Sequence, residues 1–235
     1  MKTPIEATRT SRLLLRLILR GALGLALIDA ILFGLARRVD WRAAWVLTAL
    51  FGIYLAAGVL WFVRKDPDLL SERLNNGSRA PAWDRVLVRM YWVFLVALFA
   101  TAALDAGRVQ WSHVPVAVQV LAAVGMLTAF AIIWWCTASN HYLSSQSRIQ
   151  TERGQRVVRD GPYRFVRHPM YTSIMALMPS MALLLGSWLA ILPACVIGSL
   201  FVVRTLLEDR MLREQLPGYR EYAQQVTRRL VPGIW

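Results

Sequence analysis

Long apolar runs separated by polar stretches dominate the chain from residue 13 onwards. Four of these runs approach or exceed the roughly 20 residues that a helix needs to cross a bilayer, namely about 13–36, 43–63, 86–104 and 114–138. A fifth run, 170–207, is too long for one crossing and has the turn-forming pair Gly186-Ser187 near its middle. It predicts a helical hairpin with arms at about 170–185 and 188–207. The pattern predicts an all-α, polytopic integral membrane protein with about six membrane-embedded helical segments.

Two polar stretches accompany the early spans. Residues 1–12 are predicted to lie at the membrane surface. Residues 64–85 form a loop that contains two turn-forming sequences, Asp66-Pro67-Asp68 and Asn75-Asn76-Gly77.

Most of the candidate chemistry lies in the second half of the chain. The longest polar stretch, 139–169, leads into the hairpin. The segment after the hairpin, 208–235, is charged and aromatic, helical at first and broken at Pro217-Gly218. We therefore divide the chain into N-terminal transmembrane helices, 1–138, and a region at 139–235 that carries the candidate site.

Composition and charge agree with a membrane protein. Hydrophobic residues make up 57% of the chain and charged residues 17%, which argues against a soluble domain. The net charge of +13 could suggest nucleic acid, but the basic residues cluster between apolar spans, where juxtamembrane arginines belong; we expect no nucleic-acid partner. Of the 27 Lys and Arg residues, 23 fall on one side of the predicted topology and four on the other. Both termini and the candidate site are therefore predicted to be cytoplasmic, with a bacterial-type cytoplasmic membrane expected.

Two carboxylates fall within or beside the spans. Asp29 lies well inside the first span, and an intramembrane carboxylate is a functional candidate by default. It could equally face a neighbouring helix and accept a hydrogen bond from a hydroxyl, and we favour this structural role. Asp105, near the outer end of the third span, is also predicted to be structural.

The stretch 161–171 concentrates cationic and titratable side chains. Gly161-Pro162 is a turn signal, and Pro169 is well suited to the first turn of a helix. Arg167 and His168 would then lie at a helix N-terminus beside free N–H groups, an arrangement that binds anions. A basic turn at the membrane edge accounts for the same residues, and the spacing alone does not choose between the two.

A second polar cluster follows the hairpin. Arg204 and Glu208 are four residues apart, so they share a helix face where the last span leaves the membrane. As an exposed helix-end ion pair they would contribute little. Cations, a histidine, carboxylates and tyrosines from both clusters converge there, however, and this convergence favours a functional site.

Other chemistries find little support in the sequence. The three histidines, His113, His141 and His168, lack metal-ligand spacing. No glycine-rich phosphate loop follows a strand and no nucleophile elbow is present. We expect no metal.

Several elements of the second half follow the pattern of a known family. They are Ser139-Asn140, Gly161-Pro162-Tyr163-Arg164, Arg167-His168-Pro169-Met170-Tyr171, Glu208-Asp209 with Leu212, Leu216-Pro217-Gly218-Tyr219-Arg220-Glu221-Tyr222, Val226 and Val231-Pro232. Over about residues 135–235 the chain resembles the isoprenylcysteine carboxyl methyltransferase family and its phospholipid methyltransferase relatives, which are integral-membrane, S-adenosylmethionine-dependent enzymes. Two positions depart from the pattern. Gln155 aligns where many members have a histidine, and Asp209 stands where the second of two glutamates is usual.

The resemblance implies S-adenosyl-L-methionine as cofactor and a lipophilic acceptor that enters from the bilayer: an isoprenylcysteine-like carboxylate, a lipid amine or a thiol. It implies three catalytic residues, Arg167, Glu208 and Arg204. The cofactor-binding residues that it implies are Asn140, Gln155, Tyr163, Arg167, His168, Pro169, Tyr171, Glu208, Asp209, Tyr219 and Tyr222. Two alternatives remain open, an NADPH-dependent lipid or sterol reductase of a related membrane fold and a non-catalytic lipid-binding membrane protein.

Overall fold

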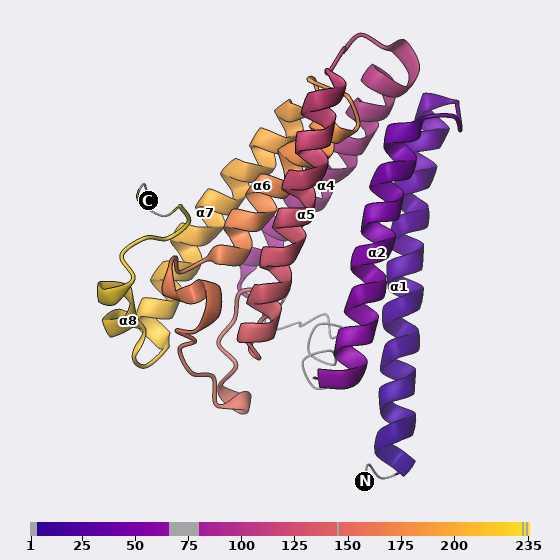
Figure 1. The fold of residues 1–235 in the computed structure, drawn as a ribbon. Coiled ribbons are helices and arrows are strands. Elements are labelled where there is room, and N and C mark those ends of the chain that lie inside the picture. The colour runs from indigo at the N-terminus through magenta and orange to yellow at the C-terminus, as the bar shows by residue number, and fades with distance from the viewer. Residues whose placement is uncertain (1–3, 66–79, 145, 232, 234) are drawn as a thin grey trace.

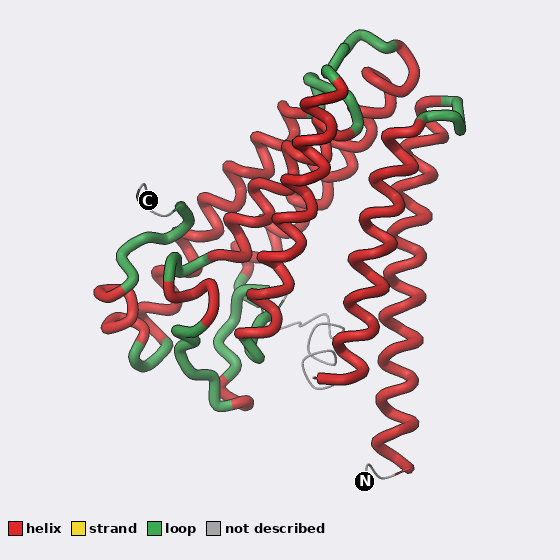
Figure 2. The backbone as a smooth tube through the Cα atoms, in the orientation of Figure 1, coloured by secondary structure: helices red, strands yellow, loops and turns green. Residues whose placement is uncertain are grey.

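The computed structural model describes residues 4–65, 80–144, 146–231, 233 and 235. All of the regular structure within this part of the chain is helical (Figure 2). The elements are α1 (Pro4–Ala36), α2 (Arg42–Lys65), α4 (Ala82–Ala102), the π-helix η1 (Ala103–Val109), α5 (Val116–Ser139), the 3-10 turns η2 (Thr151–Arg153) and η3 (Gly161–Arg164), α6 (Pro169–Leu184), α7 (Ile191–Gln215) and α8 (Tyr219–Gln225).

The predicted all-α membrane architecture with six long helical segments is confirmed. Within the described ranges, five helices are long and apolar enough to cross a membrane, and α6 is a shorter apolar helix. The arms of the predicted hairpin, α6 and α7, lie side by side (Figure 1). Gly186 at the turn between them has φ +86°, and Gly218 after α7 has φ +80°, a backbone conformation that glycine adopts without a Cβ penalty.

Two boundaries differ from the sequence prediction. Helix α1 already begins at Pro4, so most of the expected surface segment is helical. Helix α4 begins at Ala82, so the last residues of the expected 64–85 loop belong to its first turn. The two predicted turn sequences between 66 and 79 lie outside the described residues, as does Pro232.

Many large apolar side chains are exposed on the outer surface of the helices. On α1, four leucines recur at every fourth residue and are each more than half exposed: Leu15, Leu19, Leu23 and Leu27. Residues four apart lie on one face of a helix, so these side chains form a stripe that suits contact with lipid. Because α1 has apolar side chains on its outer face as well as on its core face, its sequence is a continuous apolar run rather than an amphipathic one.

The interior is one hydrophobic core shared by all six long helices. Each helix contributes at least one side chain that is no more than 2% exposed: Leu32, Leu47, Leu98, Met126, Met178 and Ile197. Between α2 and α5, the rings of Tyr54 and Phe130 stack with centroids 4.3 Å apart. In Figure 1, α1 and α2 form a pair at the side of the bundle.

The predicted structural role of Asp29 is confirmed. Its Oδ1 accepts a hydrogen bond of 2.6 Å from the hydroxyl of Thr48 on α2. A carboxylate on the first span is thus matched by a hydroxyl on the second, which ties α1 to α2 within an apolar environment.

Asp105 fastens the opposite end of the bundle from the candidate site. Its side chain is 2% exposed and accepts from the backbone N–H of Ser112 at 3.0 Å and from the Ser112 hydroxyl at 2.6 Å. The hydroxyl of Ser187, in the turn between α6 and α7, also donates to Asp105. These contacts hold the hairpin turn against η1 and confirm the structural role predicted for Asp105.

The unequal lengths of α6 and α7 create the place for the site. Helix α6 has 16 residues and α7 has 25, which at 1.5 Å per residue correspond to about 24 and 37 Å. The C-terminal end of α6 and the N-terminal end of α7 meet at the same turn. The N-terminal end of the shorter α6 therefore lies beside the polar part of α7. The N-terminal residues of α6 therefore face the last turns of α7, and the loop 140–168 fills the remaining space.

Candidate functional site

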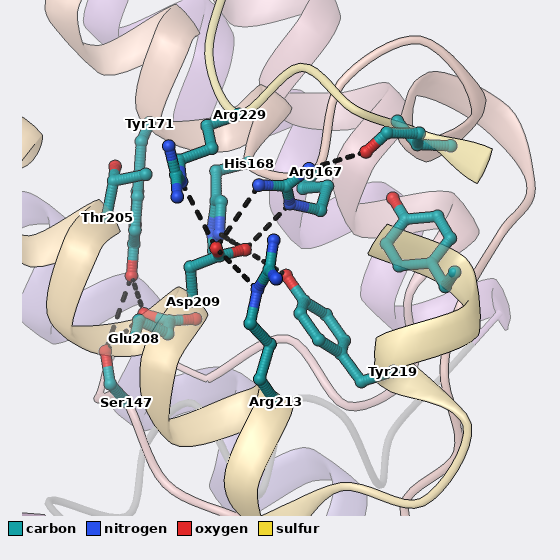
Figure 3. Close-up of polar contacts among 12 residues, drawn as sticks. Ser147, Arg167, His168, Tyr171, Thr205, Glu208, Asp209, Arg213, Tyr219 and Arg229 are labelled. Atoms are coloured by element: carbon teal, nitrogen blue, oxygen red, sulfur yellow. Dashed lines mark hydrogen bonds and ion pairs between the residues drawn. The ribbon is translucent and has the colours of Figure 1, made fainter. Parts of the chain in front are cut away.

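The centre of the polar cluster is an ion pair between Arg167 and Asp209 (Figure 3). Arg167 Nε donates to Asp209 Oδ1 at 2.7 Å and Nη2 donates to Oδ2 at 3.2 Å. The two side chains are 1% and 3% exposed. A bidentate arginine–carboxylate pair is among the strongest polar contacts in proteins, and here it joins the segment before α6 to α7.

Asp209 also collects donors from three other places. The guanidinium of Arg213, one turn later on α7, reaches Oδ2 at 3.1 Å, and that of Arg229, on the C-terminal segment, reaches it at 3.2 Å. The phenol of Tyr219 donates to Oδ1 at 3.0 Å. His168 Nε2 lies 3.7 Å from Oδ1, which is too long for a hydrogen bond.

The C-terminal segment docks on the residues before α6. The backbone N–H groups of Arg167 and His168 donate to the carbonyls of Arg228 and Arg229 at 3.0 and 2.9 Å. Arg167 Nη1 donates to the carbonyl of Val226 at 2.6 Å. The N–H groups and the guanidinium that the sequence suggested for an external anion are therefore engaged within the protein.

Glu208 is organised separately from its neighbour Asp209. Its Oε2 accepts hydrogen bonds from the phenol of Tyr171 on α6 and from the hydroxyl of Ser147 in the loop after α5 (Figure 3). No described residue donates to Oε1. The Tyr171 ring stacks on the ring of His168, with centroids 5.6 Å apart and planes 9° from parallel.

Arg204 does not form the helix-end ion pair with Glu208 that their spacing suggested. Its Nε instead donates to Asp84 Oδ1 on α4 at 2.9 Å. Its guanidinium carbon lies 5.2 Å from the ring centroid of Tyr171, within the range of a cation–π contact. Arg204 thus packs against the ring of Tyr171 without lining the cavity itself.

Two tyrosines, Tyr163 and Tyr222, tie η3 and α8 together. Asn140 Nδ2 donates to the Tyr163 hydroxyl at 3.1 Å, and the Tyr222 hydroxyl donates to the Tyr163 carbonyl at 2.6 Å. Burial is the main cause that raises the pKa of Tyr163, Tyr219 and Tyr222 above the usual value for a phenol, so all three phenols are neutral. Gly161 at the start of η3 has φ +60°, and a Cβ there would lie 2.1 Å from the Ser139 hydroxyl oxygen.

The loop after α5 is held by its own side chains. Gln155 Oε1 accepts from the backbone N–H of Gln150 at 2.7 Å. Gln150 Nε2 donates to the carbonyl of Tyr142 at 2.6 Å. At the position where many relatives have a histidine, Gln155 therefore braces the loop while also lining the cavity described next.

A cavity opens between this loop, the start of α6, the end of α7 and α8. It contains about 860 Å³ of space between atoms, part of which is open to solvent. Its wall includes ten of the eleven predicted cofactor-binding residues: Asn140, Gln155, Tyr163, Arg167, His168, Pro169, Tyr171, Glu208, Tyr219 and Tyr222. The eleventh, Asp209, and the predicted catalytic Arg204 are not among the residues of this wall.

Two buried polar atoms beside this cavity have no hydrogen-bond partner among the described residues. They are His168 Nε2 and Gln146 Oε1, and both residues line the cavity. Buried polar atoms are nearly always satisfied, so the pair points to a ligand with both an acceptor and a donor. The described part of the chain contains no group of three or more His, Cys, Asp or Glu side chains arranged to hold a metal ion.

Sequence reasoning missed several members of the site. Asp84 fell in the expected loop, although an acidic residue in a first helical turn is a weak signal for a helix start. Ser147 and Gln146 gave no signal among the many polar residues of the loop. Arg213 and Arg229 were counted only as basic residues of the C-terminal segment.

A family model described as phospholipid methyltransferase matches residues 115–217. Over this segment the chain is similar to the phospholipid methyltransferase family. The match covers α5, the site loop, α6 and α7, and it indicates membrane methyltransferase activity on a lipid-type substrate. No curated protein matches the chain.

Proposed function

We propose that this integral membrane protein transfers a methyl group from S-adenosyl-L-methionine to a lipophilic acceptor. The observation that carries the proposal is the cavity itself. All of its lining residues except Tyr219 and Tyr222 lie in the segment that matches the phospholipid methyltransferase family, and Glu208 is one of them. Two residues of the same wall, His168 and Gln146, each have a buried polar atom without a hydrogen-bond partner among the described residues.

The residues of the cavity fit the functional groups of this cofactor. S-adenosyl-L-methionine has a carboxylate that needs donors and an ammonium and ribose hydroxyls that need acceptors. His168 Nε2 offers a donor and Gln146 Oε1 an acceptor, both unused by the described residues. Glu208 Oε1 offers a charged acceptor, which suits the ammonium. Tyr163 and Tyr171 supply aromatic surface for the adenine.

When bound, the cofactor supplies an electrophilic methyl group on a sulfonium. The protein has to align the two reactants and limit water at the reacting atoms. The rigid loop, held by Gln150 and Gln155, and the docked C-terminal segment keep the cavity wall in place. Glu208 holds the charged end of the cofactor, and the acceptor approaches laterally from the bilayer. We place the cavity on the cytoplasmic side, where the Arg and Lys excess favours it.

Titration of the purified full-length protein tests the proposal. We expect isothermal calorimetry to give saturable binding of S-adenosyl-L-methionine and none of NADPH. Tritiated cofactor is then incubated with a prenylated cysteine, with phosphatidylethanolamine vesicles and with a long-chain thiol. Label in one of the three extracts identifies the acceptor class. Binding of NADPH alone supports the reductase alternative, and lipid binding without either cofactor supports the non-catalytic one.

A further inference from the structure

A carboxylate from outside the matched segment reaches the edge of the site. Asp84 lies in the first turn of α4 and is completely buried. Its Oδ1 accepts from Arg204 Nε at 2.9 Å, and its Oδ2 accepts from the backbone N–H of Ser147 at 3.1 Å. Asp84 therefore links α4 both to α7 and to the loop after α5.

Both groups that Asp84 holds stand next to a hydrogen-bond donor of Glu208. Ser147 is itself one of these donors, so the bond between its N–H and Asp84 fixes the residue whose hydroxyl reaches Glu208. The second donor, Tyr171, lies with its ring against the Arg204 guanidinium. One carboxylate on α4 thus constrains both contacts of Glu208.

We propose that Asp84 is a positioning residue for Glu208, acting through Ser147 and through Arg204 with Tyr171. The consequence for cofactor affinity rests on the proposed function, whereas the contacts that transmit it do not. A completely buried carboxylate is costly unless it is paired. Asp84 meets this requirement with partners from two segments that line or support the cavity, rather than with a neighbour on its own helix.

Asp105 provides a matched control for a purely structural role. It is 2% exposed, and it also accepts a backbone N–H hydrogen bond, from Ser112. It lies at the opposite end of the bundle and does not line the cavity. If Asp84 only stabilised the fold, Asp84→Asn and Asp105→Asn would affect cofactor binding alike.

The first arm measures S-adenosyl-L-methionine affinity of the full-length protein by calorimetry. We expect Asp84→Asn to weaken binding by about three- to tenfold, because Glu208 loses its fixed orientation but keeps its charge. Asp105→Asn should stay within about twofold of wild type. In a Glu208→Gln background, Asp84→Asn should add no further loss, because residues that act through one another are not additive. Additive losses would overturn the proposal.

The second arm measures amide hydrogen exchange at Ser147 without any ligand. Asp84→Asn should accelerate this exchange by about tenfold or more, and Asp105→Asn should leave it unchanged. If wild type binds no S-adenosyl-L-methionine, the proposed function fails and this arm alone decides on positioning. Unchanged amide exchange at Ser147 in Asp84→Asn would refute the positioning role of Asp84. If Asp84→Asn does not fold, Asp84→Glu, which keeps the charge but moves the carboxylate by a methylene, takes its place in both arms with the same expectations.

Discussion

A buried aspartate fastens each end of the helical bundle, and the two differ in what surrounds them. Asp105 and Asp209 are both 2% exposed. Among the described residues, Asp105 accepts from neutral donors alone, the hydroxyl and N–H of Ser112 and the hydroxyl of Ser187. Asp209 accepts from three guanidinium groups and one phenol.

The difference shows how similar burial can serve two purposes. The Asp105 cluster carries a net negative charge and joins two short links, so it can do little more than close the bundle. The Asp209 cluster carries three positive charges against one negative, and one of them belongs to Arg167 on the cavity wall. Asp209 therefore joins several segments of the protein to one another, while the neighbouring Glu208 lines the cavity.

Three substitutions test this comparison, in order of their cost to the free energy of unfolding. The largest effect is expected for Asp209→Ala. It leaves the Arg167 guanidinium, which is 1% exposed, without its carboxylate, and removal of one partner of a buried ion pair costs about 3–5 kcal/mol. The unfolding midpoint in detergent should fall sharply, and trypsin should cut readily at Arg228 and Arg229 because the C-terminal segment loses its anchor.

The control for Asp209→Ala is Arg210→Ala on the next residue. Arg210 pairs with Glu214 on the helix surface, with side chains 76% and 51% exposed, and such pairs contribute little. Its unfolding midpoint and its trypsin pattern at Arg228 and Arg229 should match wild type. A stable, protease-resistant Asp209→Ala protein would show that the arginine cluster does not hold the segment.

Asp105→Asn should have an intermediate effect. The carboxylate uses Oδ1 for the Ser112 N–H and Oδ2 for the two hydroxyls. The amide has one acceptor oxygen, so at least one of these donors loses its acceptor, at a cost of about 1–3 kcal/mol. Because its partners Ser112 and Ser187 lie away from the cavity, binding of S-adenosyl-L-methionine should be retained. Thermal unfolding checks the loss of stability, and calorimetry on the same preparation checks the retained affinity. A loss of affinity would show that the Asp105 end of the bundle also affects cofactor binding.

The sequence predicts the architecture well because membrane spans are defined by local properties. Length and apolar content alone locate the helices to within a few residues, apart from the early starts of α1 and α4. The hairpin turn and the break after α7 follow from Gly186 and Gly218, whose backbone conformations favour glycine. Matching Asp29 to a hydroxyl on a neighbouring helix likewise follows from the cost of an unpartnered carboxylate in an apolar setting.

The pairing of charges in the site could not be predicted in the same way. The i,i+4 spacing suggested that Arg204 pairs with Glu208, but Arg204 reaches Asp84, 120 residues away. Arg167 similarly binds Asp209, 42 residues away. These partners depend on how α4 and α6 pack against α7, which no local pattern encodes. The family match at residues 115–217 overlaps the stretch that carries the resemblance, and the residue roles stay predictions.

The smallest cost to unfolding is expected for Glu208→Gln, and there the comparison becomes sharpest. The amide keeps an oxygen that can accept from Ser147 and Tyr171, so the unfolding free energy should change by no more than about 1 kcal/mol. It removes the negative charge that we propose for the cofactor ammonium, and a lost charged hydrogen bond weakens binding by about tenfold or more. Methyl transfer and calorimetry should therefore report a large loss in a protein that melts almost like wild type. Asp105→Asn should show the reverse pattern, with a lower melting temperature and retained affinity. If Glu208→Gln turned over at the wild-type rate, Glu208 would be only a structural acceptor for two hydroxyls. The carboxylates at both ends of the bundle would then have structural roles alone.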